Sequence, residues 1–502
     1  MNAQDSASAS SFVTSGVQGL DEVLGGGLTQ DRLYLVEGVP GSGKTTIAMQ
    51  FLLEGARRGE PVLYITLSES AAELQGVAES HGWSLDGVTI REIIPSEDSL
   101  KPDAQYTMFH PSEIELGETI RTILEDVDRE KPVRAVFDSL SELRLLAGNP
   151  LRYRRQILAL KQFFAGRRCT VILLDDMTST DHDLQVQSIA HGVVLLEQMN
   201  PDYGADRRRM RVVKYRGVPF RSGYHDYVIR RGGVEVFARL VAREHSAPKA
   251  PELLSSGLAE LDHLLGGGIE RGTSMLIAGA PGTGKSTIAT RLVWMAAERG
   301  QKAALFSFDE SLLTLRMRAT GLGMPLEDHV KSGRLTLQKV DPAELAPGAF
   351  IQAVREAVEK RSAAVIVIDS LNGYLNAMPG ERFLVIQLHE LLAYLGHAGV
   401  ATVMISAHQG LIGGHMQSPV DASYLADTVV LMRYFEARGA VRQAISVVKK
   451  RGSAHERTIR EFRMDDGGIH IGPPLRKFRG ILTGTPEFDG SGEDEGTEEA
   501  RP

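Results

Sequence analysis

The sequence predicts an α/β protein built from two tandem copies of one domain, each with a mainly parallel β-sheet flanked by helices. Three observations support this prediction. A stretch beginning at Ser15 is repeated, with similar sequence, from Ser256. Short apolar runs of strand length alternate with segments of helical spacing, which is the pattern of a parallel sheet covered on both faces. The chain has 502 residues, enough for roughly two to four domains of ordinary size.

The repeat covers a whole domain rather than a short solenoid unit, which would be roughly 20–50 residues long. SGVQGLDEVLGGGLTQDRLYLVEGVPGSGKTTIA, from Ser15, matches SGLAELDHLLGGGIERGTSMLIAGAPGTGKSTIA, from Ser256, at an offset of about 241 residues. Pro248 and Pro251, in REHSAPKAPELLS, indicate a linker between the copies. We therefore expect a disordered N-terminus at 1–13, a first domain at 14–246, a linker at 247–254, a second domain at 255–482 and an acidic disordered tail at 483–502.

The expected elements of the first copy begin with a strand at RLYLVEG. The glycine-rich loop comes next, followed by a helix whose apolar residues Ile47, Phe51 and Leu52 have helical spacing. Four further apolar runs continue the series, namely PVLYITL, VRAVFDS, CTVILLDD and GVVLLEQ. The second copy supplies the corresponding runs SMLIAG, KAALFSF, AVIVIDS, ATVMIS and DTVVLMRY. Each copy thus provides strands for a largely parallel sheet.

The composition is that of a globular protein from a reducing compartment. The chain is 42% hydrophobic and 24% charged, with a formal net charge of -8. About six of these negative charges lie in the last twenty residues, so the remainder is close to neutral, which argues against a dedicated DNA binder. Cys169 is the single cysteine, so no intrachain disulfide can form. The N-terminus lacks a signal segment and no apolar run approaches the roughly 20 residues of a membrane span, so we expect a cytoplasmic protein.

Two glycine-rich loops carry the pattern G-x-x-x-x-G-K-[ST], which is typical of phosphate binding; the alternative is a structural loop without a ligand. Glycines allow backbone N–H groups to surround phosphate oxygens, and the following helix N-terminus adds partial positive charge. Lys44 and Lys285 are expected to reach the β- and γ-phosphates. The candidate nucleotide-binding residues are Gly38, Gly41, Ser42, Gly43, Lys44, Thr45 and Thr46 in GVPGSGKTT, and Gly279, Gly282, Thr283, Gly284, Lys285, Ser286 and Thr287 in GAPGTGKST.

The same loops predict a Mg²⁺ site that accompanies ATP. Thr45 and Ser286 follow the lysines and are expected to place a hydroxyl on the metal. An acidic partner is expected at the end of a buried strand, and Asp138 and Asp369 end two such runs. A carboxylate at the carboxyl end of a parallel strand faces the ligand crevice. The alternative is that each acid caps the turn after its strand.

These motifs resemble those of the KaiC family, whose members include the cyanobacterial circadian clock protein. Each copy begins with a sequence like GLDxxLGGG. The family's C-terminal domain is similar to two stretches of the second copy, VVKKRGSAHERTIREF and ADTVVLMRYFEARG. The resemblance covers roughly residues 12–488. It implies two tandem RecA-like P-loop NTPase domains in a homohexamer of stacked double rings, with ATP between adjacent subunits. It also implies slow ATP hydrolysis and, in clock members, serine or threonine autophosphorylation near the second site.

The family places two adjacent acids after the second strand of each copy, and the resemblance implies that the catalytic base is among them. The second copy has Asp309 and Glu310, whereas the first has Ser68 and Glu69. A carboxylate there can accept a proton from water or a hydroxyl as the γ-phosphate leaves. We therefore hypothesise that the second copy keeps a full acidic pair, while the first hydrolyses through Glu69 alone or mainly binds ATP. The alternative is that these are solvated residues at strand ends.

The resemblance also implies basic residues that act on the nucleotide of a neighbouring subunit. Lys214 and Arg216 in VVKYRG, and Lys449 and Arg451 in VVKKRG, fill these positions. Such cations stabilise charge on the transferring phosphoryl group, and the alternative is a solvated basic strand end.

The phospho-acceptor implied by the family is a serine followed by a threonine. Here DASYLADT places Ser423 at the serine and Tyr424 at the threonine. The resemblance therefore predicts autophosphorylation at Ser423, with Tyr424 as a second acceptor. Because tyrosine replaces the threonine, we do not expect a two-site phosphorylation cycle like that of the clock members. The alternative for Ser423 is an ordinary turn or capping serine.

Two other classes of function compete with an ATPase and autokinase. RecA/RadA-like DNA-dependent ATPases share the core, but the candidate loop HQGLIGGHMQSP, at 408–419, contains no Lys or Arg, so we expect no DNA partner. The other class is a nucleotide-controlled scaffold with little catalysis. A clock-like switch, or a signalling or stress switch, would act through a KaiB-like or other signalling partner.

Overall fold

A computed structural model of the chain consists of two compact units, Met1–Arg239 and Leu240–Pro502. The structure describes residues 12–93, 111–177, 184–201, 204–242, 252–376, 383–407, 423–437, 439–482 and 487–488. The expected N-terminus, linker and acidic tail lie largely outside these residues, and the domain boundaries stay predictions. No helix in the described part of the chain is both long enough and apolar enough to cross a membrane.

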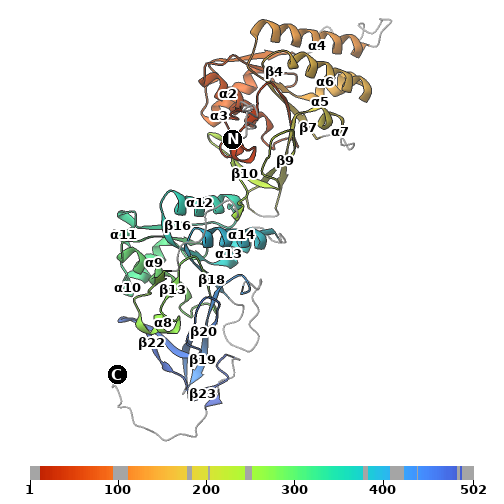
Figure 1. Ribbon diagram of the computed structural model, residues 1–502. Coiled ribbons are helices and arrows are strands. Elements are labelled where there is room, and N and C mark those ends of the chain that lie inside the picture. The colour runs from red at the N-terminus through yellow and green to blue at the C-terminus, as the bar shows by residue number, and fades with distance from the viewer. Residues whose placement is uncertain are drawn as a thin grey trace, which may run out of the picture. The chain divides into compact units, whose positions relative to one another are not determined.

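The first unit contains a nine-stranded sheet in the order β11-β10-β9-β8-β3-β7-β6-β4-β5 (Figure 1). Its strands are β3 (Leu33–Gly38), β4 (Val62–Thr66), β5 (Val88–Glu92), β6 (Arg134–Asp138), β7 (Thr170–Asp176), β8 (Gly192–Met199), β9 (Arg207–Tyr215), β10 (His225–Arg230) and β11 (Gly233–Phe237). β3 to β8 pair in parallel, whereas β9 to β11 add an antiparallel extension. The mainly parallel sheet that the sequence predicted is confirmed.

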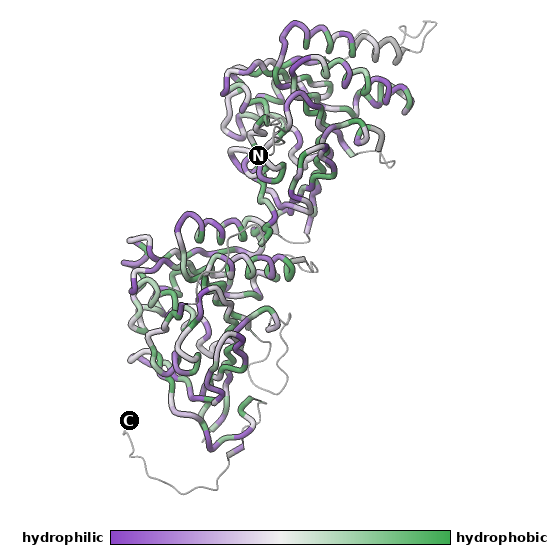
Figure 2. The backbone as a smooth tube through the Cα atoms, viewed as in Figure 1, coloured by the Kyte–Doolittle hydropathy of each residue, from purple (hydrophilic) through white to green (hydrophobic). Residues whose placement is uncertain are grey.

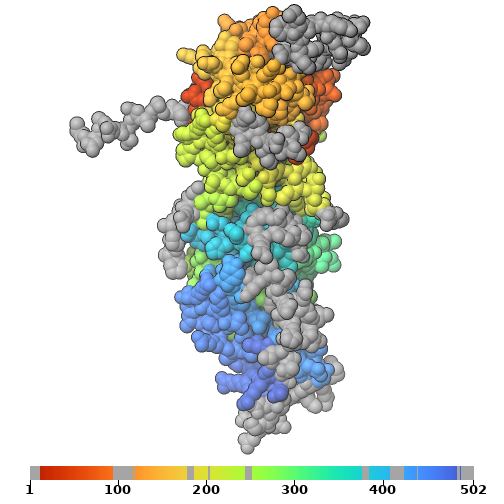
Figure 3. Space-filling model, turned by 90° about the vertical axis from the view of Figure 1, so that its right-hand side faces the viewer, coloured from red at the N-terminus to blue at the C-terminus, as the bar shows by residue number. Residues whose placement is uncertain are grey.

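Helices cover both faces of the first sheet because successive strand residues point to opposite sides. Tyr34 and Val36 of β3 share a core with Ile47 of α2, whereas Leu35 shares the opposite core with Ile157 of α6. Helices α4 to α6 form a continuous outer surface of this unit (Figure 3). The helices are α1 (Leu20–Val23), α2 (Lys44–Arg57), α3 (Ala71–His81), α4 (Pro111–Glu130), α5 (Leu140–Ala147), α6 (Pro150–Ala165) and α7 (Leu184–Ile189).

The second unit repeats this topology, with a nine-stranded sheet in the order β16-β15-β17-β18-β14-β19-β20-β21-β22. Its strands are β14 (Ser274–Gly279), β15 (Lys302–Ser307), β16 (Leu335–Lys339), β17 (Ala363–Asp369), β18 (Ala401–Ala407), β19 (Thr428–Ala437), β20 (Ala440–Lys450), β21 (Arg460–Asp465) and β22 (Gly468–Pro474). β14 to β19 pair in parallel and β20 to β22 pair antiparallel. Each strand therefore has a counterpart in the first unit.

Helices again pack on both faces of the second sheet. Met275 and Ile277 of β14 share a core with Ile288 of α9, and α12 to α14 contact β17 and β18. Within each unit the parallel core strands are largely apolar, whereas the outer helices and the antiparallel strands carry hydrophilic stretches (Figure 2). The helices are α8 (Ala259–Leu264), α9 (Lys285–Glu298), α10 (Leu312–Gly321), α11 (Glu327–Lys331), α12 (Pro347–Glu359), α13 (Leu371–Asn376) and α14 (Phe383–His397).

Short two-stranded ribbons complete the two units. They pair β1 (Phe12–Val13) with β2 (Leu28–Thr29), β12 (Leu253–Leu254) with β13 (Ile269–Glu270), and β23 (Phe478–Arg479) with β24 (Glu487–Phe488). The third ribbon includes two residues of the segment that was expected to be a disordered tail. The repeated stretch that begins at Ser15 and again at Ser256 forms a short helix, a short strand, the central strand, the glycine-rich loop and the start of the long helix.

Candidate nucleotide-binding sites

Each phosphate loop lies between the central strand and a long helix, at the carboxyl edge of the sheet. Gly43 and Gly284 are the N-cap residues of α2 and α9, with φ of 94° and 97°. A Cβ on Gly43 would lie 2.7 Å from Ile229, and one on Gly284 would lie 2.5 Å from Phe462. Neither helix N-terminus has a side-chain cap, so its first backbone N–H groups remain available to an anion.

Lys44 of the first loop is held at the carboxyl end of the sheet. Its Nζ donates to the backbone oxygens of Gly38 at 2.8 Å and Val39 at 3.1 Å. It also forms an ion pair of 2.6 Å with Oδ1 of Asp176, the last residue of β7. Asp176 was not among the predicted site residues, and it lies 132 positions after Lys44 in the sequence.

Lys285 of the second loop has different surroundings. Its Nζ donates to the backbone oxygen of Ala280 at 2.6 Å. Burial lowers the pKa of Lys285 to about 8, although the carboxylate of Asp369 opposes this shift. β18 ends opposite Gly279 in Ala407, at the position that Asp176 occupies in β7, so an ion pair like that of Lys44 cannot form there.

The predicted Mg²⁺ residues lie next to one another in both units. The Thr45 hydroxyl donates to Oδ2 of Asp138 at 3.2 Å, and Tyr64 donates to the same oxygen at 2.6 Å. Asp138 is 6% exposed, and burial raises its pKa against the hydrogen bonds from Tyr64 and Thr45. In the second unit, burial raises the pKa of Asp369, and a hydrogen bond with Ser286 opposes the shift.

The donor set fits Mg²⁺ coordinated by oxygen. A hydroxyl and a carboxylate lie side by side at the start of the phosphate-loop helix, and Mg²⁺ typically combines one or two carboxylates with substrate phosphates. Both acids are buried, and among the described residues no cation forms an ion pair with either carboxylate, a condition that a divalent ion would relieve.

Glu69 of the first unit interacts electrostatically with Lys44 of the loop. The Thr66 hydroxyl and the Glu69 backbone N–H fix the turn after β4, at 2.7 and 2.9 Å. Oε2 of Glu69 is buried and accepts no hydrogen bond from the described residues. Burial raises the pKa of Glu69, and the negative charges of Asp138 and Asp176 raise it further. Its neighbour Ser68 carries no charge.

Both acids of the corresponding pair in the second unit accept hydrogen bonds from side chains. Asp309 accepts a hydrogen bond of 2.6 Å from Ser370. Glu310 accepts two from Arg318, at 2.7 and 3.3 Å, and Arg318 also donates to Thr287 of the loop at 2.9 Å. The sequence analysis missed Arg318. The available signal was its place on α10, two turns after the N-cap residue Ser311, whereas the first copy has Val77 there.

The four predicted trans-acting cations lie away from the phosphate loop of their own copy. Lys214 donates to the backbone oxygen of Gln187 at 2.7 Å, and Arg216 donates to that of Ser188, also at 2.7 Å. Burial lowers the pKa of Lys214, and the charge of Arg216 lowers it further. His191 lies in the same cluster, and its pKa is lowered to about 4, first by burial and then by the surrounding cations.

The second unit repeats this arrangement at the predicted phospho-acceptor segment. Lys449 donates to the backbone oxygens of Ser423 at 2.8 Å and Ala426 at 2.7 Å. Arg451 donates to that of Tyr424 at 3.0 Å. The Tyr424 side chain is 55% exposed and Ser423 is half-buried.

Hydrogen bonds place these cations at the amino edge of each sheet. The backbone of Arg216 bonds to His191, which bonds to Leu33 at the start of β3; in the second unit Arg451 bonds to Asp427, which bonds to Ser274 at the start of β14. Both strands have six residues, so their ends lie roughly 16 Å apart at about 3.3 Å per residue. The cations and Ser423 therefore lie at the opposite edge of the sheet from the loop of the same copy.

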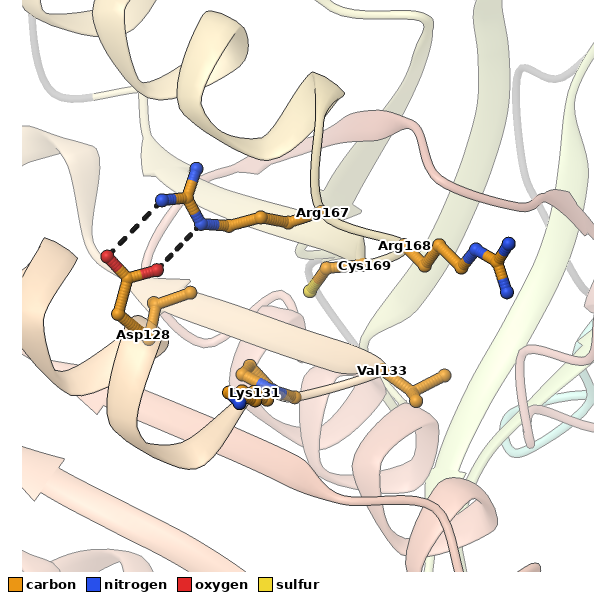
Figure 4. Close-up of a pocket in the computed structure, with 8 residues that line it drawn as sticks. Asp128, Lys131, Val133, Arg167, Arg168 and Cys169 are labelled. Atoms are coloured by element: carbon orange, nitrogen blue, oxygen red, sulfur yellow. Dashed lines mark hydrogen bonds and ion pairs between the residues drawn. The ribbon is translucent and has the colours of Figure 1, made fainter.

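A separate pocket of about 340 Å³ lies near the amino ends of β6 and β7 (Figure 4). Arg167 forms a two-pronged ion pair with Asp128 at its wall, at 2.8 and 3.2 Å. Cys169 is buried there, and burial raises the pKa of its thiol to about 12. The pocket is thus distant from the phosphate loop in its own unit, and its thiol stays protonated at neutral pH. The loop at 408–419, with His408 and His415, lies outside the described residues.

Two mainly parallel sheets, each with a glycine-rich loop after its central strand and a buried acid two strands away, define tandem RecA-like P-loop ATPase domains. The family model described as "ATPase: KaiC" matches residues 13–241 and 254–476. The chain therefore belongs to the KaiC family of ATPases.

Curated relatives match over almost the full chain. The chain is 28% identical over 486 residues to the circadian clock protein KaiC3 of Synechocystis sp., which covers 95% of both chains. It is 27% identical over 481 residues to the circadian clock oscillator protein KaiC of Picosynechococcus sp., covering 94% of this chain and 91% of that protein. The KaiC of Synechococcus elongatus is 27% identical over 477 residues, with the same shares covered. The sequence-based recognition of the family is confirmed.

Proposed function

We propose that this protein is a Mg²⁺-dependent ATPase that binds two ATP molecules per chain and assembles into a homohexamer with ATP between neighbouring subunits. The observation that carries this proposal is the placement of loop and cations at opposite edges of each sheet. A cation that cannot reach the nucleotide of its own copy can still act on that of the next subunit. The proposed domains are 14–246 and 255–482, with one nucleotide site in each.

The residues of each site have separate proposed roles. The loop amides with Lys44 or Lys285 bind the β- and γ-phosphates, and Thr45 with Asp138, or Ser286 with Asp369, hold Mg²⁺. The metal neutralises charge on the phosphates. Glu69 in the first site, and Glu310 with Asp309 in the second, accept the proton of the attacking water.

The trans-acting cations complete the site from the neighbouring subunit. Lys214 and Arg216 serve the first site, and Lys449 and Arg451 serve the second, by stabilising charge on the γ-phosphoryl group. All four donate to backbone carbonyls, and Arg451 also forms an ion pair of 3.5 Å with Asp427. A phosphate can replace the carbonyls because charge-assisted bonds to an anion are stronger.

Complementation tests this shared-site arrangement. Arg451→Ala subunits supply an intact loop, and Lys285→Ala subunits supply intact cations, so mixed assemblies contain some complete second sites. We expect ATP turnover in the mixture to exceed that of either variant alone. Molecular mass measured with and without ATP serves as the control for assembly. No partial rescue in mixed assemblies of the correct size would contradict the proposal.

The two sites are proposed to be unequal. The second has the full acidic pair, and the first depends on Glu69, so Lys285→Ala is expected to remove most of the ATP turnover. Lys44→Ala provides the matched comparison in the first site. If Lys44→Ala removed most of the turnover and Lys285→Ala little, the order of the two sites would be reversed.

A second candidate function is autophosphorylation of Ser423. Lys449 and Arg451 bond to the backbone of Ser423 and Tyr424, so an ATP brought to these cations by a neighbour would lie beside both hydroxyls. Intact-protein mass after incubation with Mg-ATP measures the modification, and Ser423→Ala separates it from phosphorylation of Tyr424. No added phosphate on the parent protein would end this proposal.

We also propose that the nucleotide state is read by a signalling partner, as in a clock-like or stress switch. The supporting observation is that the relatives described above are named as circadian clock proteins. A partner such as a KaiB-like protein should bind the ATP-loaded and the ADP-loaded assembly with different affinity.

Filter binding with single- and double-stranded DNA tests the competing recombinase class, for which we expect no specific retention.

A further inference from the structure

One carboxylate distinguishes the two phosphate loops more sharply than any loop residue. Asp176 Oδ1 lies 2.6 Å from Lys44 Nζ, and the side chains are 30% and 8% exposed. The register of β3 and β7 sets this contact, because it places Asp176 directly opposite Gly38. The same register in the second unit places Ala407 opposite Gly279. A methyl group cannot compete for Lys285.

Asp176 lies among the residues proposed to bind the terminal phosphate and its metal, because it contacts Lys44. The charge of Asp176 contributes to the raised pKa of both Glu69 and Asp138, after the larger effect of burial, so the three carboxylates share one space around the loop. Glu69 and Asp138 are the groups proposed for the attacking water and the metal, which belong beside the γ-phosphate.

The neighbouring acid, Asp175, links β7 to helix α5. Asp175 points to the other side of β7, accepts a hydrogen bond of 3.2 Å from Ser141 and pairs with Arg144. Asp176 has Lys44 as its ion-pair partner, and its side chain is partly exposed. Removing its charge should therefore change the site rather than the fold.

We propose that Asp176 makes the first site prefer a nucleoside diphosphate over a triphosphate, relative to the second site. The inference rests on the proposed nucleotide sites. To hold the γ-phosphate, Lys44 must give up its contact with Asp176. The carboxylate is then left without its cation and beside a phosphate of the same charge sign. A diphosphate lacks the terminal group that meets Asp176, so it is penalised less.

Equilibrium dialysis of the full chain tests this preference. Lys285→Ala silences the second site, and ADP and the slowly hydrolysed analogue AMP-PNP are the two probes, each with Mg²⁺. Asp176→Ala copies the second site, and Asp176→Asn removes the charge while keeping the shape. In both variants we expect the ratio of the Kd for AMP-PNP to the Kd for ADP to fall about tenfold, or about 1.4 kcal/mol. A fall of less than threefold in both would overturn the inference.

Two controls separate the possible failures. Glu79→Gln removes an exposed acid whose carboxylate bonds to Gln75, and it should leave the ratio unchanged. The reciprocal Ala407→Asp change, in a Lys44→Ala background, should raise the ratio at the second site. Binding of both nucleotides with an unaltered ratio would overturn the inference alone. If the parent bound neither nucleotide, the proposed function would fail together with it.

Discussion

Two nitrogen atoms of Arg318 donate hydrogen bonds to the carboxylate of Glu310, at 2.7 and 3.3 Å, one to each carboxylate oxygen. The first copy has Val77 at the corresponding place, and one buried oxygen of its Glu69 carboxylate has no hydrogen-bond partner in the described part of the chain. A carboxylate held by a guanidinium must lose a charge-assisted hydrogen bond before it can accept a proton. The second site therefore has the fuller acidic pair, but its candidate base is restrained.

Replacing Arg318 by valine, as in the first copy, should release Glu310. In a Lys44→Ala background, we expect Arg318→Val to raise the kcat of the second site by roughly 3–10-fold, which is a fraction of what a general base contributes. Steady-state phosphate release measures this rate. Arg316→Val is the control, because Arg316 lies on the same helix as Arg318 but pairs with Glu327 of α11, at 3.2 Å. A lower kcat in Arg318→Val than in its parent would instead assign Arg318 a positive role.

The affinity of the second site for nucleotide should fall as the pH becomes alkaline. The pKa of Lys285 is about 8 in the free site, and a bound phosphate favours the protonated form. Raising the pH through 8 therefore removes the charge that the phosphate requires. In a Lys44→Ala background, we expect the Kd for AMP-PNP to rise about tenfold between pH 7 and pH 9. Lys285→Arg keeps its charge throughout this range, so a pH dependence of equal size in that variant would contradict the explanation.

Asp138 should destabilise the protein when no nucleotide is bound. Its pKa is raised by burial, so the folded state takes up a proton more readily than the unfolded state, and the folded state loses stability as the pH rises above the unfolded pKa. We expect Asp138→Asn to raise the Tm by about 2–4 °C at pH 7.5, corresponding to about 1 kcal/mol. The gain should shrink toward pH 4. Thermal unfolding of Asp86→Asn, at an exposed acid, should show no gain at either pH.

Arg134 should be important for the stability of the first unit. It is 1% exposed, donates to the backbone oxygens of Thr14 at 2.8 Å and Phe51 at 3.0 Å, and pairs with Glu60. Arg134→Ala leaves these acceptors without their donor and should cost about 3 kcal/mol, measured by denaturant unfolding. Arg129→Ala, at a largely exposed arginine, is the control. An equal loss in both variants would contradict the role of burial.

The local motifs were predictable from the sequence because they depend on short-range spacing. A glycine loop between an apolar run and a helix positions Lys44 and Thr45, and the end of a buried strand positions Asp138 beside them. The parallel core strands were predicted for the same reason: their runs are continuous and apolar. The antiparallel extension was not predicted, because β9 in the first unit mixes arginines with apolar residues and has no clean periodicity.

The charge pairs at the two sites could not be predicted from one sequence. Asp176 reaches Lys44 through the register of two strands, and Arg318 reaches Glu310 because α10 packs beside the loop. Both contacts depend on tertiary placement rather than on spacing. The internal repeat did contain the contrast, since Asp176 aligns with Ala407 and Arg318 with Val77, but a contrast between copies does not say which atoms touch.

The separation of loop and cations gives each subunit a polarity. In the proposed assembly, a subunit would present an acceptor edge and a donor edge, so contacts of this kind would run head to tail. An open arc of subunits leaves one incomplete catalytic centre per layer at its end, whereas closure of the arc completes every centre. ATP turnover per chain should therefore increase with the number of subunits in the arc and reach its full value only in the closed ring. The rate of ATP hydrolysis would then report whether the ring is closed.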